Sequence, residues 1–388
     1  MTTLCTAEAV AEGQPDKLCD RIADAVLDAA LRQDPDTRSS CEVAICGSTV
    51  HLMGILKTTA AINWDALVRS VIASAGYTDP AYGFCAQNCM VQNELQPPSP
   101  DLLRTEPRHS TPDRSAASQH TVVGFACRET PDFMPLPVEL ARSVIHHLAL
   151  VRKNGVLPFL LPDGKAQITL EYEGDVPKRI ASLLLCAQHT EQTEIEPLRS
   201  ILMKKVIHAA IPSSLLDDSS TVFINPTGRF VTGGPAAATG MTGRKIACDT
   251  YGSASSQWDG SFSGKDASHP EKFAAYLARY LAKNTVAAGF ARKCEFQLSY
   301  AVGLADPVAV AIRTFGTETI HVQQILQLAQ ECIDFRPAAV LERFCLCRPI
   351  YSALCAGQFG KNARRMPWEQ TDLAALWRSR VNLCTAAG

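Results

Sequence analysis

The sequence has little that would take it to a membrane or to a nucleic acid. No run of about 18 apolar residues is present, so we expect no membrane-spanning helix. Basic residues are not in excess: 37 lysines and arginines face 39 acidic residues, which argues against a nucleic-acid-binding or membrane-surface protein. Residues 1–5 lack the basic start of a signal peptide. These absences favour a cytoplasmic protein.

Cysteine is plentiful, but paired cysteine motifs are missing. The 15 cysteines are an odd number at scattered positions, which does not indicate a disulfide framework. Cys85 and Cys89 are too far apart for a Cys-x-x-Cys pair, and Cys345 and Cys347 are too close together. Nothing near Cys85 and Cys89 completes a metal site, so we expect buried, reduced thiols.

A Walker A loop is also missing, although glycines lie beside cations in residues 240–245 and 264–265. Such pairs let backbone and side chains approach a phosphate closely, whereas a Gly-Arg-Lys triplet by itself is typical of an exposed turn. Two further Asp/Lys pairs strengthen the phosphate interpretation, since carboxylate oxygens suit Mg²⁺. The candidate cations are Lys17, Lys165, Arg244, Lys245 and Lys265, with Asp16 and Asp163 as candidate carboxylates.

The pattern along the chain predicts a mixed α and β protein large enough for two or three compact units. A helix begins at Pro15, with apolar residues every four positions on one face and aspartates on another. The proline-rich segment 94–118 is predicted to be a loop of a length typical of lids or disorder. Further helices are expected at 64–75, 137–151, 198–210, 271–290 and 322–332, and strands within 41–56, 166–173, 294–302 and 308–314.

Many short motifs resemble those of S-adenosylmethionine synthetases (methionine adenosyltransferases). Residues 8–16 are similar to the opening signature of that family, and 262–266 to its second signature. The other matching segments follow in the family's order: 157–158, 162–165, 188–189, 224–230, 233–235, 242–246, 249–251, 314–317, 359–360 and 367–369.

The resemblance implies an α/β (α+β) fold of three similar sheet-plus-helix subdomains with pseudo-threefold symmetry. The expected divisions are an N-terminal subdomain at 1–100, a mobile gating loop at 101–120, a central subdomain at 121–230 and a C-terminal subdomain at 231–388. Family members pair through flat sheet faces and share active sites between two subunits. The resemblance therefore implies a homodimer or homotetramer, or a heteromer with a conventional synthetase.

The resemblance also implies the reaction. In the family, the methionine sulfur attacks C5′ of ATP, and the leaving triphosphate is then hydrolysed. A thioether has no proton to lose, so catalysis should come from positioning and from stabilising the leaving group. The implied roles are Mg²⁺ binding by Asp16 and Glu271, K⁺ binding by Glu42, phosphate binding by the five candidate cations, ribose binding by Asp163 and adenine contacts from Arg229 and Phe230.

The chain departs from the family mainly where the second substrate would bind. Three carboxylates are lost there, and a buried ammonium without a partner costs several kcal/mol, so methionine fits poorly in its usual pose. The departures are Gln14 for His, Ile55 for Glu, Pro98 for Gln, Ser118 for Asp, Ala238 for Asp, His269 for Lys and Glu271 for Asp.

Three functions are open on this evidence. The retained phosphate cations favour an ATP-dependent adenosyltransferase that moves the 5′-adenosyl group to a sulfur or another small nucleophile. The alternative is a catalytically weak paralogue that acts as partner or regulatory subunit of a true synthetase. A triphosphatase or ATP-binding remnant is the third alternative.

Overall fold

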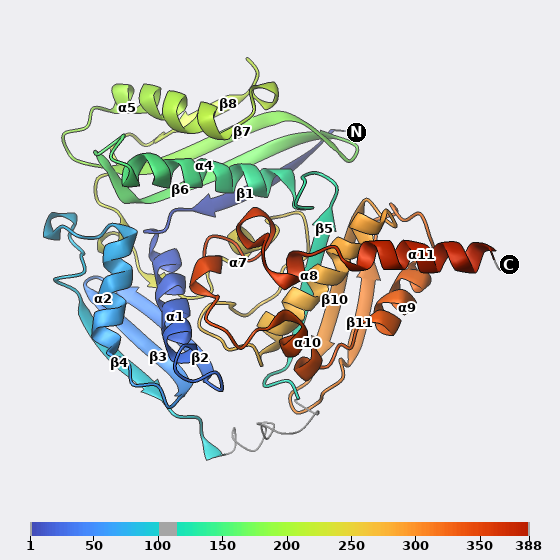
Figure 1. Ribbon diagram of the computed structural model, residues 1–388. Helices are drawn as coiled ribbons and strands as arrows, with labels where there is room; N and C mark the ends of the chain where they lie inside the picture. The colour runs from blue at the N-terminus through green and yellow to red at the C-terminus, as the bar shows by residue number, and fades with distance from the viewer. Residues whose placement is uncertain (1, 101–114, 387–388) are drawn as a thin grey trace.

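The computed structural model describes residues 2–100 and 115–386 and contains three β-sheets, each covered by helices (Figure 1). The three sheet-plus-helix units surround a central region that holds the short helix α7 (Ile246–Asp249). This arrangement confirms the predicted mixed α/β fold class. In the part of the chain that is described, no helix is long and apolar enough to cross a membrane.

The first sheet has the strand order β4-β3-β2-β9 and is formed largely by the N-terminal part of the chain. Its strands are β2 (Arg38–Cys46), β3 (Thr49–Lys57), β4 (Met90–Gln96) and β9 (Gly240–Met241). Helices α1 (Pro15–Leu31) and α2 (Trp64–Ala75) pack on this sheet, and both helices were predicted from the sequence. Strand β4 pairs with β3, so the prediction of a loop from residue 94 onward was wrong for residues 94–96. Most of the predicted gate, residues 101–114, lies outside the described residues.

The second sheet joins the N-terminal strand to the centre of the chain. Its order is β1-β6-β7-β8, with strands β1 (Thr2–Val10), β6 (Leu160–Glu173), β7 (Val176–His189) and β8 (Thr221–Ile224). Helix α4 (Leu136–Lys153) packs on β1 and β6. The predicted helix 198–210 is interrupted: α5 (Ile195–Leu202) leads into a π-helical turn (Met203–Ile207) and the short α6 (His208–Ala210).

The third sheet has the strand order β11-β10-β5 and packs against helix α8 (Pro270–Ala288). Its strands are β5 (His120–Cys127), β10 (Lys293–Tyr300) and β11 (Ala309–Arg313). Nearly every residue of α8 is buried, which its alanine- and leucine-rich sequence permits. Helices α9 (Val322–Cys332), α10 (Pro337–Phe344) and α11 (Leu373–Ala386) complete this unit.

Helix α1 ties the three units together through its acidic face. Its aspartates are four residues apart, so they share one side of the helix, and they are buried. Each accepts a backbone N–H from a segment far along the chain. The pairs are Asp20 with Gly243 (2.9 Å), Asp24 with Gly264 (3.0 Å), and Asp28 with Tyr351 (3.0 Å) and Ser352 (2.8 Å). This acidic face therefore fixes both glycine–cation loops.

Candidate functional site

A carboxylate–cation cluster lies at the N-terminus of α1. The Asp16 carboxylate is buried and accepts hydrogen bonds from Lys245 Nζ, from the Met241 N–H (3.0 Å) and from Gln14 Nε2 (3.2 Å). Arg244 lies 3.9 Å away. Burial opposes ionisation, but these hydrogen bonds, above all that from Lys245, hold the pKa of Asp16 below its ordinary value. Asp16 is thus a carboxylate at neutral pH.

Gln14 has a structural role in addition to its place in this cluster. It is the N-cap of α1, and its Oε1 accepts the N–H of Lys17 at 3.0 Å. Pro15 follows at the first helical position, where a missing N–H costs nothing. Both ends of the Gln14 amide are therefore bonded within the protein, one to the helix and one to Asp16.

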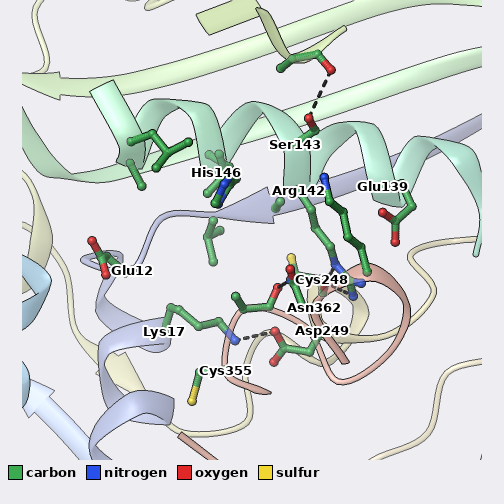
Figure 2. A pocket seen from close by; sticks show the side chains of 18 of the residues that line it. Glu12, Lys17, Glu139, Arg142, Ser143, His146, Cys248, Asp249, Cys355 and Asn362 are labelled. Atoms are coloured by element: carbon green, nitrogen blue, oxygen red, sulfur yellow. Dashed lines mark hydrogen bonds and ion pairs between the residues drawn. The ribbon is translucent and has the colours of Figure 1, made fainter. Parts of the chain in front are cut away.

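Lys17 is held away from the Asp16 cluster. Its ammonium donates to Asp20 (3.0 Å) and to Asp249 (2.5 Å), and its side chain is only 5% exposed. Burial works against the charge, but the two carboxylates raise the pKa of Lys17 above its ordinary value. Burial also raises the pKa of Asp249 to about 6. Figure 2 shows this pair at the edge of a cavity beneath α4.

Lys165 extends the Asp16 cluster along the second sheet. It lies on β6, pairs in register with Val10 and forms an ion pair with Glu8 at 2.8 Å. Burial opposes ionisation of Glu8, but Lys165 and the nearby charge of Lys245 lower the pKa of that carboxyl. The structure thus brings together five predicted residues and adds Glu8; the five are Gln14, Asp16, Lys165, Arg244 and Lys245. The sequence signal for Glu8 was its position at the start of the opening motif.

The residues predicted to contact ribose and adenine lie along β6 and the glycine-rich segment. Asp163 accepts the Gly234 N–H at 2.8 Å, and burial raises the pKa of its carboxyl. Gly234 has a φ of +59°, and a Cβ there would lie 1.9 Å from the hydroxyl of Tyr77. Phe230 donates its N–H to His189 Nε2 at 3.1 Å. Arg229 pairs with Glu191 at 2.6 Å, and Ala238 is exposed.

A second cluster surrounds Glu271 at the start of α8. Its carboxylate accepts from Lys265 Nζ at 2.6 Å and from the Ser118 hydroxyl at 3.1 Å, and it lies 3.2 Å from His120 Nδ1. The Ser118 hydroxyl is also 3.5 Å from His269 Nδ1. Although burial opposes ionisation, Lys265 lowers the pKa of Glu271. His120 was not proposed from sequence, because only the fold brings it to Glu271.

Ile55 belongs to the neighbourhood of this second cluster. It pairs with Ser40 across β2 and β3, and Ser40 forms a β-bridge with Lys265. Pro98 is half-buried beyond the end of β4, and Glu42 is exposed on β2.

Among residues 2–100 and 115–386, no hydrogen bond or ion pair joins the Asp16 cluster to the Glu271 cluster, and no group of three His, Cys, Asp or Glu side chains is arranged for a metal ion.

Family models match almost the whole chain, in three consecutive parts. The S-adenosylmethionine synthetase N-terminal domain matches residues 2–100, its central domain matches residues 113–230, and its C-terminal domain matches residues 232–370. The three domains occur in order and agree with the motif resemblance in the sequence. The chain therefore belongs to the S-adenosylmethionine synthetase family, a family of ATP-dependent adenosyl-transferring enzymes.

Proposed function

We propose that the protein binds the triphosphate of ATP with Mg²⁺ and transfers the 5′-adenosyl group to a small nucleophile other than methionine in its usual pose. The observation that carries this proposal is the pair of clusters in which a lysine holds a buried carboxylate. These are Lys245 on Asp16 and Lys265 on Glu271. Each lysine follows a glycine-containing loop that α1 holds by a backbone hydrogen bond.

The first step we propose is an exchange of partners. Phosphate oxygens take the place of the two carboxylates beside Lys245 and Lys265, because charge-assisted bonds to phosphate are strong and short. Arg244 and Lys165 are more exposed and can turn toward the same phosphates. These four side chains then stabilise the charge that develops on the leaving triphosphate, and no general base is required.

The exchange leaves Asp16 and Glu271 suited to a metal ion. Both carboxyls have lowered pKa values, so both are ionised, as a metal ligand must be. Mg²⁺ is commonly held by one or two protein carboxylates together with substrate phosphates, which agrees with two separate carboxylates and no preformed cage in the described part of the chain. When bound, Mg²⁺ would supply further neutralisation of the triphosphate charge. A K⁺ ion near the exposed Glu42 remains a proposal from the family alone.

The second-substrate region supports a nucleophile that needs no carboxylate anchor. Ile55 and Ala238 offer no charge, and the Ser118 hydroxyl is hydrogen-bonded to Glu271. Glu271 is the second proposed metal ligand, so its carboxylate has little capacity left for an ammonium group. Methionine would then bury its ammonium without a full partner, which costs several kcal/mol.

A dimer with shared sites is part of the proposal. The two clusters are unconnected within the described chain, and family members complete their sites across two subunits. Exposed apolar side chains on the sheets support such pairing: Leu4 on β1 is 65% exposed, Met90 on β4 is 57% exposed and Phe223 on β8 is 46% exposed. A heteromer with a conventional synthetase would use the same faces.

The second candidate function, a partner or regulatory subunit, is favoured by the uncharged Ile55 and Ala238.

Product analysis tests the proposed reaction. The purified protein is incubated with ATP and Mg²⁺, with and without methionine and with a panel of small thiols and thioethers, and the products are analysed by mass spectrometry. We expect a 5′-adenosyl adduct of a nucleophile other than methionine, together with triphosphate or its hydrolysis products. ATP that stays intact under every condition, in a protein that still binds it, would support the regulatory-subunit alternative instead.

A further inference from the structure

A cavity of about 580 Å³ lies beneath α4, between α1, the end of β1 and residues 352–362 (Figure 2). Sites for small organic ligands typically have volumes of about 300–1,000 Å³. None of the phosphate-binding residues of the Asp16 and Glu271 clusters lines it: Asp16, Lys165, Arg244, Lys245 and Lys265 are all absent from its wall. The cavity is thus separate from the proposed ATP site.

The strongest charges at the floor of the cavity are already satisfied. Lys17 is bound by Asp20 and Asp249. Arg142 is buried, and its guanidinium donates four hydrogen bonds to backbone carbonyls of residues 248, 250 and 359, at 2.9–3.3 Å. These two cations therefore have little left to offer a phosphate or another multivalent anion.

Two groups of opposite charge in the wall, the half-buried Glu139 and the exposed Lys361, are not paired with each other. The Oε1 atom of Glu139 is buried and has no hydrogen-bond partner among the described residues. It lies against Gly360, where an added Cβ would be only 2.6 Å away, and Lys361 follows Gly360 in the sequence. Within the described structure, no ion pair joins Glu139 to Lys361, although the charges of Arg142 and Arg364 act on Glu139 from nearby. Glu139 itself is half-buried, so its carboxylate keeps acceptor capacity for a donor in the cavity.

The wall beside these charges is apolar. Leu140 and Ile145 of α4 are 5% and 8% exposed, and Ala9 of β1 is 4% exposed. Ala149 and Leu150 continue the same surface along α4. A ligand that fills the cavity consequently needs an apolar body in addition to its charged groups.

We propose that this cavity binds a small amino-carboxylate with an apolar body. Its ammonium donates to Glu139 and its carboxylate faces Lys361, while the apolar body lies along α4. A ligand with both charges matches two opposite groups that do not reach each other, whereas a simple amine or a simple acid matches only one. This site is independent of the proposed adenosyl transfer.

Calorimetric titration of the full chain with L-phenylalanine tests the site. Phenethylamine and 3-phenylpropionate, which each lack one of the two charges, are the matched probes. We expect saturable binding of L-phenylalanine and binding at least tenfold weaker for either analogue. Glu139→Gln and Lys361→Met should each weaken L-phenylalanine binding by about tenfold, the effect of losing one charge-assisted bond.

Further variants separate the cavity from the ATP site and from misfolding. Ala149→Trp fills the cavity with an apolar side chain and should abolish binding, whereas Glu331→Gln on the exposed face of α9 and Lys265→Ala in the second cluster should leave it unchanged. Thermal unfolding checks that each variant is folded. The proposal is overturned by absence of saturable L-phenylalanine binding up to about 10 mM, by unchanged binding in Ala149→Trp, or by phenethylamine binding as tightly as L-phenylalanine.

Discussion

The Asp20 carboxylate accepts the backbone N–H of Gly243 at 2.9 Å and so connects the first helix to the loop that carries Arg244 and Lys245. Its other oxygen accepts from Lys17 at 3.0 Å. The same helix holds the loop before Lys265 through Asp24. One helical face therefore positions both groups of proposed phosphate-binding cations.

Asp20→Ala should reduce both stability and nucleotide affinity. The change leaves a buried N–H without its acceptor and removes one of the two partners of Lys17, and breaking a buried pair of this kind costs about 3–5 kcal/mol. Denaturant unfolding measures the stability, and titration with ATP and Mg²⁺ measures the affinity. Asp28→Ala is the matched control: it removes the acceptor for the N–H groups of Tyr351 and Ser352, so it should destabilise the fold but leave ATP affinity unchanged.

Methionine should be a poor substrate for the purified chain. Positions 55, 118 and 238 offer no carboxylate to its ammonium, so turnover should fall well below the range of about 1–10³ per second that is typical of enzymes. The variant Ile55→Glu/Ser118→Asp/Ala238→Asp should increase S-adenosylmethionine formation. Formation at ordinary enzyme rates by the unmodified protein would show that methionine is held in another way.

The contribution of Glu271 to stability should depend on pH. Its pKa is lowered in the folded state, chiefly because Lys265 overcomes the effect of burial, so its stabilising effect is present above the unfolded pKa of about 4.3. That effect is lost as the pH falls through the folded pKa. The difference in unfolding free energy between the wild type and Glu271→Gln should therefore be largest near neutral pH and shrink below about pH 4. Urea unfolding of both proteins at several pH values measures this difference. A difference that does not change with pH would contradict a stabilising ion pair between Lys265 and Glu271.

A buried ion pair holds the C-terminal segment to α8. Glu369 accepts from Arg279 at 2.9 Å and 3.0 Å and from Lys283 at 2.5 Å, and its side chain is completely buried. Glu369→Ala should destabilise the protein by about 3–5 kcal/mol, because two buried cations lose their partner. The exposed pair of Glu331 and Arg380 provides the control, and Glu331→Ala should cost less than about 1 kcal/mol.

The sequence predicts those elements whose signals are local. Helix α2 matches its expected limits because Asn63 caps its first turn and Gly76, with φ of +109°, ends it. Strand β1 was not predicted, since residues 2–10 are mostly small and their extended form depends on pairing with β6 more than 150 positions later. Strand β4 was missed for a similar reason, because its partner is the distant β3.

The residues of the candidate site also divide into those predicted from local sequence and those whose contacts depend on distant parts of the chain. Residue types and motif order predicted Asp16, Lys245 and Lys265, and the structure places each in a carboxylate–cation cluster. The orientation of Lys17 was not predictable, because its partner Asp249 is 232 positions away and reaches it only through the packing of α7 against the N-terminal part of the fold. The roles of all these residues in catalysis stay predictions.

Equilibrium titration with ATP and Mg²⁺ tests the central claim most directly, with one variant from each cluster. A charge-assisted contact to phosphate is worth about 1.5–3 kcal/mol, so Arg244→Ala and Lys265→Ala should each weaken binding by about tenfold or more. Lys178→Ala, which removes an exposed lysine paired with Glu173, should bind as the wild type does. Unchanged ATP affinity in both Arg244→Ala and Lys265→Ala would contradict the proposed phosphate site.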